Sequence, residues 1–114
     1  GLYDTLMKAR GVKLLEPLSY VDFMNIVTGS RFVITDSGGL QEETSYLGIP
    51  CLTMRENTER PITITQGTSR LVRAGNLSEH VRMIMNGEWQ TGVCPPLWDG
   101  KTAGRAARAL QARL

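Results

Sequence analysis

Two short polar segments carry the residue types that bind phosphate. The first runs from Thr35 to Glu43 (TDSGGLQEE) and the second from Arg55 to Pro61 (RENTERP). Glycines let a backbone approach a ligand closely, and the free N–H groups at the start of a helix attract anions. Ser37 adds a hydroxyl donor, and an arginine can bind a phosphate through two parallel hydrogen bonds. The segments therefore indicate a site for a phosphorylated ligand. A simple turn and a solvated, salt-bridged loop are the alternatives.

Two neighbouring acids, Glu42 and Glu43, follow the glycine pair. Acids are favoured in the first turn of a helix whatever their function. A diphosphate would repel a carboxylate, so an acid that binds the same ligand must reach another part of it. A ribose offers two hydroxyls that can both donate to one carboxylate. Successive helical residues point about 100° apart, so the two acids should have different roles, and Glu43 is the candidate for the ribose.

Strands and helices alternate along the chain and must position these segments. Apolar runs predict strands, and helical spacing with capping residues predicts helices. The expected strands are 12–15, 32–35, 51–54 and 68–72, and the expected helices are 20–27, 40–47 (after a tight turn at 36–39), 78–86 and 102–114. This order predicts one α/β domain over residues 1–114, a small parallel sheet with helices on both faces. Both polar segments then fall at the carboxyl ends of strands, where such sheets bind ligands.

Several local features sharpen this prediction. Ser19 and Ser78 are expected to cap their helices, and Gly48 is expected to close the helix that follows the glycine pair. The continuous apolar run 32–35 is typical of a strand buried on both faces. The last helix should bury a stripe of small and apolar residues, made of Ala103, Ala106, Ala107, Leu110 and Leu114.

Composition excludes several classes of function. The chain has 114 residues, 41% of them hydrophobic, and a net charge of +2. No apolar run approaches the roughly 20 residues that cross a bilayer, so no membrane partner is expected. The basic residues near the end are interpreted as a solvated helix face, so no nucleic-acid partner is expected either. Cys51 and Cys94 lack metal-ligand spacing, which predicts a reduced, cytoplasmic protein without a metal or cofactor. The single histidine, His80, is expected at the surface.

The polar segments belong to a longer series of motifs. Its blocks are EPL (16–18), TDSGGLQEE (35–43), LGIP (47–50), TERP (58–61), GT (67–68) and LV (71–72). In order and spacing this series resembles the non-hydrolysing UDP-N-acetylglucosamine 2-epimerases. Ile62, Arg73 and Trp98 depart from it, because the family usually has Glu, Gly and a Tyr-Gly pair there. The resemblance implies the C-terminal, Rossmann-like half of a two-domain GT-B fold, with a UDP-sugar bound between the domains.

The resemblance also implies roles for individual residues. Ser37, Gly38 and Gly39 would hold the diphosphate, Glu43 the ribose, and Arg60 would lie near the phosphates. Phe23 falls where the family has an aromatic residue against the uracil ring, although it could equally be a core residue of its helix.

The implied reaction converts UDP-GlcNAc to UDP-ManNAc by elimination and re-addition of UDP, in cell-envelope polysaccharide biosynthesis. The family's acid and base carboxylates and its catalytic histidine lie in segments upstream of the part that this chain matches. No catalytic residue is therefore expected in this chain, which should be inactive without its partner, the N-terminal domain. An apolar face that such a domain would cover could instead pair two copies as a homodimer. A non-catalytic UDP-binding module and a GT-B glycosyltransferase domain are the alternative functions.

Overall fold

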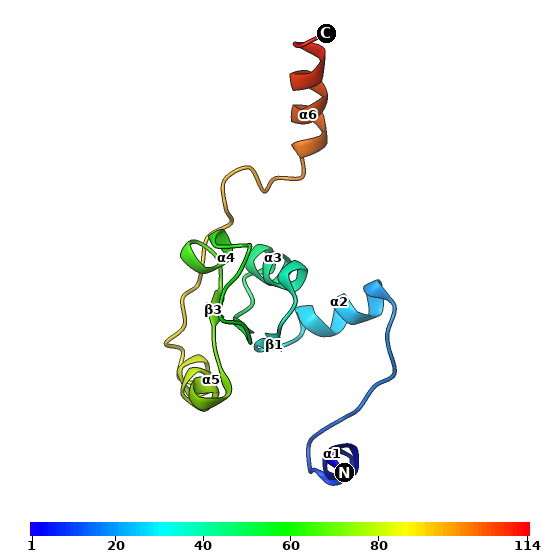
Figure 1. The fold of residues 1–114 in the computed structure, drawn as a ribbon, viewed down its shortest axis with the longest axis vertical. Helices are drawn as coiled ribbons and strands as arrows, with labels where there is room; N and C mark the ends of the chain where they lie inside the picture. The colour runs from blue at the N-terminus through cyan, green and yellow to red at the C-terminus, as the bar shows by residue number, and fades with distance from the viewer.

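The computed structural model describes residues 1–114 and contains a three-stranded parallel sheet (Figure 1). Its strands are β1 (Val33–Thr35), β2 (Cys51–Thr53) and β3 (Ser69–Leu71). The strand order is β1-β2-β3, so β1 and β3 form the two edges. Thr35 pairs with Thr53, and Thr53 with Leu71, so the carboxyl ends of all three strands lie level with one another at one end of the sheet.

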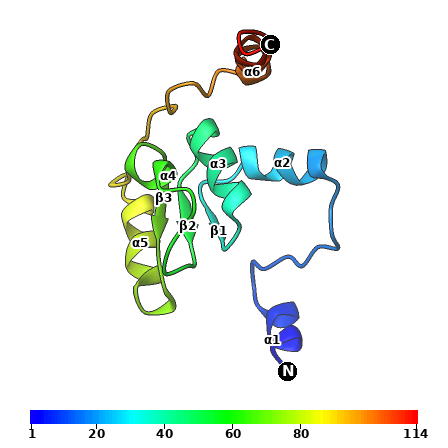
Figure 2. The same cartoon turned by 45° about the horizontal axis from the view of Figure 1, so that its top comes forward.

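The remaining elements are mostly helical. They are α1 (Leu2–Lys8), α2 (Tyr20–Thr28), α3 (Gly38–Leu47), α4 (Ile62–Thr65), the 3-10 helix η1 (Ala74–Asn76), α5 (Leu77–Met85) and α6 (Thr102–Gln111). Helix α3 packs over β2 and β3, and α2 lies beside α3 (Figure 2). On the opposite face, Arg70 of β3 contacts Met83 of α5 and stacks over the Trp89 ring. The predicted parallel sheet with helices on both faces is confirmed.

Local capping rules explain where the central helices begin and end. The Ser19 side chain accepts a hydrogen bond from Asp22 N at the start of α2, as predicted. The Ser37 side chain does the same for Leu40 N at the start of α3. Gly48 ends α3 in the left-handed conformation, with φ of 75°, which glycine adopts at little cost. These caps fix the position of α3 along the chain.

The interior has an apolar part and a polar part. Val27, Leu40 and Ile49 form a buried cluster against which Met24 and Val33 pack. Beneath α3 and beside the strands the buried side chains are mostly polar, namely Gln41, Thr44, Ser45, Thr53, Thr63, Thr68 and Ser69. They are hydrogen-bonded to one another or to the backbone; Thr53 Oγ1, for example, lies 2.8 Å from Ser69 Oγ. The α3 side of the sheet is therefore held by directional bonds as well as by apolar burial.

Some predictions about strands were wrong. Residues 12–15 form no strand, because no other segment lies beside them to pair, and Val12 and Leu15 are exposed. The run 32–35 is not buried on both faces, since Ile34 is 46% exposed. Ile34 lies on the same face of the sheet as Leu52 and Arg70, the face where α5 packs, and its side chain is only partly covered there.

Predictions about two helices also failed. Ser78 does not cap α5, because η1 leads directly into that helix, which begins one residue earlier at Leu77. The apolar stripe of α6 is not buried: no residue of α6 is, and Leu110 is 66% exposed. Helices α1 and α6 both stand apart from the sheet (Figures 1 and 2), so their apolar side chains have no core to enter.

Candidate functional site

The corner between β1 and α3 is open to solvent. Ser37 and Gly39 are exposed, and the Ser37 N–H donates to Thr35 Oγ1 at 3.1 Å. A Cβ atom built on Gly38 would meet nothing within 4 Å, and one on Gly39 would meet only Ser37 Oγ at 3.9 Å. Neither glycine has a positive φ. The pair therefore provides room for a close approach to the backbone, rather than an unusual backbone conformation.

Glu43 faces α2 and is held there by a tyrosine. The Tyr20 hydroxyl donates to Glu43 Oε1 at 2.7 Å, which joins two residues 23 apart in sequence. This hydrogen bond raises the pKa of Tyr20 above its usual value, because ionisation would place two negative charges together. Glu43 and Tyr20 also line a cavity of about 480 Å³, with Met24, Tyr46 and Trp98 among its walls. Sequence reasoning missed Tyr20 as a site residue, because the contact depends on how α2 and α3 pack.

Phe23 lies on α2 one turn from Tyr20. Its side chain is 40% exposed and lies outside the cavity that contains Glu43. The buried face of α2 is formed instead by Val27, with Met24 packed beside it. The alternative that Phe23 is a core residue is therefore wrong, and its ring remains free to contact a ligand.

Arg60 contacts α3 through Glu42, the one of the two acids that was not predicted to bind the ligand. Its Nε lies 2.5 Å from Glu42 Oε1, an ion pair without hydrogen-bond geometry, and both side chains are about 40% exposed. The two acids thus have separate contacts, as their angular separation predicted. A half-exposed pair of this kind contributes little to stability, so Arg60 can leave Glu42 for a stronger anionic partner at small cost.

Arg55, by contrast, fits the simpler interpretation of its segment. It pairs with Glu59 at 3.5 Å across a mostly solvated loop. It also lines a cavity of about 580 Å³ at the carboxyl ends of β2 and β3, together with Met54, Val72 and Arg73. This cavity adjoins the corner, because Met54 N donates to Thr35 O at 2.8 Å.

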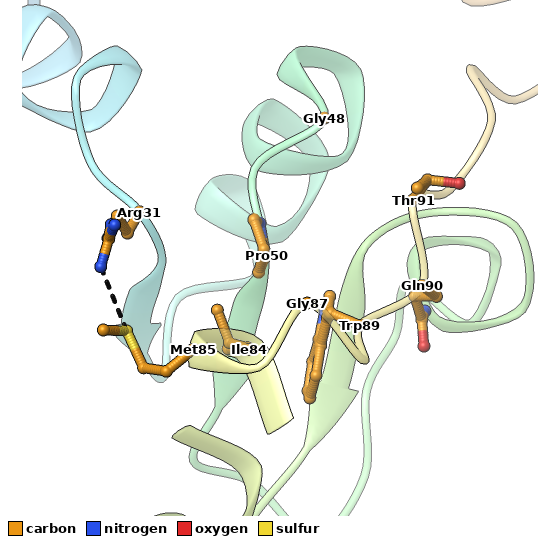
Figure 3. Close-up of a pocket in the computed structure, with 9 residues that line it drawn as sticks. All are labelled: Arg31, Gly48, Pro50, Ile84, Met85, Gly87, Trp89, Gln90 and Thr91. Carbon is orange, nitrogen blue, oxygen red and sulfur yellow. Dashed lines mark hydrogen bonds between the residues drawn. The ribbon is translucent and has the colours of Figure 1, made fainter. Parts of the chain in front are cut away.

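A further cavity of about 360 Å³ lies at the other end of the sheet, where the strands begin (Figure 3). Pro50, just before β2, forms part of its wall, and Trp89 lines it as well. The Arg31 guanidinium is directed toward Met85 Sδ, 3.7 Å away. This cavity shares none of the residues around the corner. His80 is half-buried beside it, with its Nδ1 2.8 Å from Asn76 O and its ring edge-on to Trp89, rather than at an open surface.

The structure therefore gathers most of the predicted site around the first turns of α3. Ser37, Gly38 and Gly39 form the open corner, Glu43 lies on the α2 side, and Arg60 lies on the α4 side. No group of three or more His, Cys, Asp or Glu side chains is arranged to hold a metal ion. None of the helices combines the length and apolar character needed to cross a bilayer.

Fold and site together define a parallel α/β protein in which a helix N-terminus, at the carboxyl ends of the strands, lies between an acid on one side and a guanidinium group on the other. The family model for UDP-N-acetylglucosamine 2-epimerase matches residues 2–111, and the chain belongs to this family. The UDP-N-acetylglucosamine 2-epimerase of Methanocaldococcus jannaschii is 35% identical over 114 residues, covering 96% of this chain. That of Salmonella typhimurium is 40% identical over 106 residues, covering 88%.

Solved structures agree with the family assignment. The M. jannaschii enzyme in complex with UDP-GlcNAc and UDP aligns with 97% of this chain, with a TM-score of 0.79 and 35% identity. The Neisseria meningitidis enzyme bound to UDP-GlcNAc aligns with 97%, with a TM-score of 0.80 and 30% identity. The chain spans only 30% of the length of the M. jannaschii relative and 28% of the Salmonella one, so it corresponds to part of such an enzyme.

Proposed function

We propose that this chain is the UDP-binding part of a UDP-N-acetylglucosamine 2-epimerase. The observation that carries the proposal is the open corner at the start of α3, with Glu43 on one side and Arg60 on the other. A helix N-terminus presents free N–H groups and the positive end of its dipole, which suit a diphosphate. The ligands named for the solved M. jannaschii and N. meningitidis enzymes support the same ligand class.

In this proposal each of the site residues contacts a different part of the nucleotide. Ser37, Gly38 and Gly39 contact the diphosphate, and Arg60 approaches it after leaving Glu42. Glu43 accepts hydrogen bonds from the ribose hydroxyls, and Phe23 lies against the uracil ring.

In the reaction, a base removes the proton at C2 while the C1–O bond to UDP breaks, which leaves a 2-acetamidoglucal. Reprotonation at the other face of C2 and re-addition of UDP complete the inversion. The corner and Arg60 stabilise the negative charge that develops on the leaving UDP.

The acid and base groups at C2 lie outside this chain in the proposal. Near the corner, Glu42 is paired with Arg60 and Glu43 with Tyr20. The only histidine, His80, is packed against Trp89 at the other end of the sheet. The chain would then act together with the domain that carries those groups, in the cytoplasm where nucleotide sugars are made. The purified chain alone is expected not to convert UDP-GlcNAc to UDP-ManNAc, and measurable turnover would contradict this division of labour.

Calorimetric titration with UDP tests the site. The wild-type chain should bind, and Glu43→Ala and Arg60→Ala should each weaken binding about tenfold, the size of one charge-assisted contact. Glu59→Ala is the matched control, because Glu59 belongs to the same loop but pairs only with Arg55. Unchanged affinity in both site variants would defeat the assignment. Sedimentation velocity of the same samples decides between a monomer and a homodimer.

A further inference from the structure

Gln41 is fully buried in the first turn of α3, although it is a large polar residue. Its Oε1 lies 2.9 Å from the Thr58 hydroxyl and 3.2 Å from the Thr63 hydroxyl. Thr58 lies in the loop after β2, and Thr63 lies in α4. One amide group therefore connects α3 to both ends of the segment that carries Arg60.

The same two threonines hold the backbone of Arg60. Arg60 N donates to Thr58 Oγ1 at 2.9 Å, and Thr63 Oγ1 donates to Arg60 O at 2.7 Å. Both backbone polar groups of Arg60 are thus fixed by hydroxyls that meet at Gln41. On the side-chain end, Arg60 pairs with Glu42, the residue that follows Gln41 in α3.

The Thr63 hydroxyl has a single hydrogen, and the two acceptors within its reach are Arg60 O at 2.7 Å and Gln41 Oε1 at 3.2 Å. The shorter contact, to Arg60 O, is the stronger of the two, and the Thr58 hydroxyl donates to Gln41 Oε1 at 2.9 Å. Gln41 Nε2 is buried without a partner. Both threonines therefore meet at one end of the amide.

We propose that Gln41 is a positioning residue that sets Arg60 against the N-terminus of α3. The contacts Gln41–Thr58 and Gln41–Thr63 act on Arg60 through its backbone. They therefore fix the backbone position from which the Arg60 side chain extends toward the corner. Its effect on UDP binding rests on the proposed function. Its effect on the order of Arg60 does not, because these four contacts to Gln41 and Arg60 are all present without a ligand.

Two measurements on the full chain test the role. Gln41→Met keeps the length of the side chain and removes the amide. In the ligand-free protein, nuclear magnetic resonance relaxation of the Arg60 Nε–H group should show fast motion in Gln41→Met and restricted motion in wild type. In UDP titrations, Gln41→Met should weaken binding about as much as Arg60→Ala, and adding it to Arg60→Ala should change affinity less than twofold, because the two act through one group.

Thr44→Val is the matched control. Thr44 is also fully buried in α3, but its hydroxyl bonds only to Leu40 O and Gln41 O within the helix. Its loss should lower thermal stability and leave both the Arg60 relaxation and the UDP affinity unchanged. If Gln41→Met does not fold, Thr58→Val removes one arm of the network from a half-buried position and should produce part of the same two effects.

The outcomes separate the proposed role of Gln41 from the proposed UDP-binding function. If Arg60 is equally ordered in wild type and in the folded variants, or if the losses of affinity from Gln41→Met and Arg60→Ala multiply in the double variant, Gln41 does not position Arg60. If wild type fails to bind UDP, the proposed function is wrong, and the relaxation comparison still decides the role of Gln41.

Discussion

Gly67 is the position where a single methyl group should damage the fold most directly. It is buried just before β3, where α3 and α4 both approach the backbone. A Cβ atom there would lie 2.5 Å from Thr63 O and 2.7 Å from Ser45 Cβ, and closer still to Ser45 Oγ. Ordinary contacts to a Cβ atom start near 3.4 Å, so Ser45 of α3 or the end of α4 must move.

The cost of Gly67→Ala follows from these contacts. Inserting a methyl group into a packed interior costs about 1–3 kcal/mol. Displacing Ser45 also breaks the hydrogen bond from Thr68 N to Ser45 Oγ, worth about 1 kcal/mol. The stiffer unfolded chain of an alanine variant returns roughly 0.4–1 kcal/mol. We expect the free energy of unfolding to fall by about 2 kcal/mol, and Tm by roughly 10 °C for a chain of this size.

Urea denaturation followed by tryptophan fluorescence measures this change. Trp89 reports on the affected region, because its indole N–H donates to Thr68 O at 2.8 Å, one residue from Gly67. Gly75→Ala is the matched control: a Cβ atom there meets nothing within 4 Å, and its φ is not positive. The control should stay within about 0.5 kcal/mol of wild type. Equal stability of the two variants would refute the packing argument.

Three further changes probe the caps and ion contacts. Ser37→Ala removes the cap of α3 and should lower stability by about 1 kcal/mol, which the same denaturation assay measures. The Tyr20–Glu43 contact raises the pKa of Tyr20, so its stabilisation is complete below about pH 10 and is lost as pH rises through the raised value. An absorbance titration of tyrosinate should therefore shift to lower pH in Glu43→Gln. Hydrogen bonds from the backbone N–H of Lys101 and from Arg105 lower the pKa of Asp99. The stabilisation from these bonds is therefore present above the usual aspartate pKa and is lost as pH falls through the lowered value. Asp99→Asn should remove this acid dependence from the circular dichroism of α6.

Features that depend on a few consecutive residues were predicted from the sequence. The cap at Ser19 and the left-handed Gly48 follow from side-chain chemistry and backbone sterics within one helical turn. The different contacts of Glu42 and Glu43 follow from the angle between successive helical residues. The corner at the start of α3 could be predicted for the same reason.

Features that depend on what lies beside a segment could not be predicted in this way. A strand at 12–15 needs a neighbour to pair with, and the stripe of α6 needs a surface to cover, and neither is supplied. The Tyr20–Glu43 bond and the Arg60–Glu42 pair join residues distant in sequence. Their partners follow from the packing of α2 and α4 against α3, which periodicity does not specify.

β1 is an edge strand of the sheet, which affects how the chain will behave in concentrated solution. Strand edges in native proteins are usually shielded by charged side chains, proline or a covering element. β1 has the sequence Val33-Ile34-Thr35, without a charge, and Ile34 is exposed. A net charge of +2 supplies little electrostatic repulsion between molecules. Aggregation should therefore begin by strand addition at this edge, and a buffer well below the pI of 8.8 should slow it by raising the positive charge.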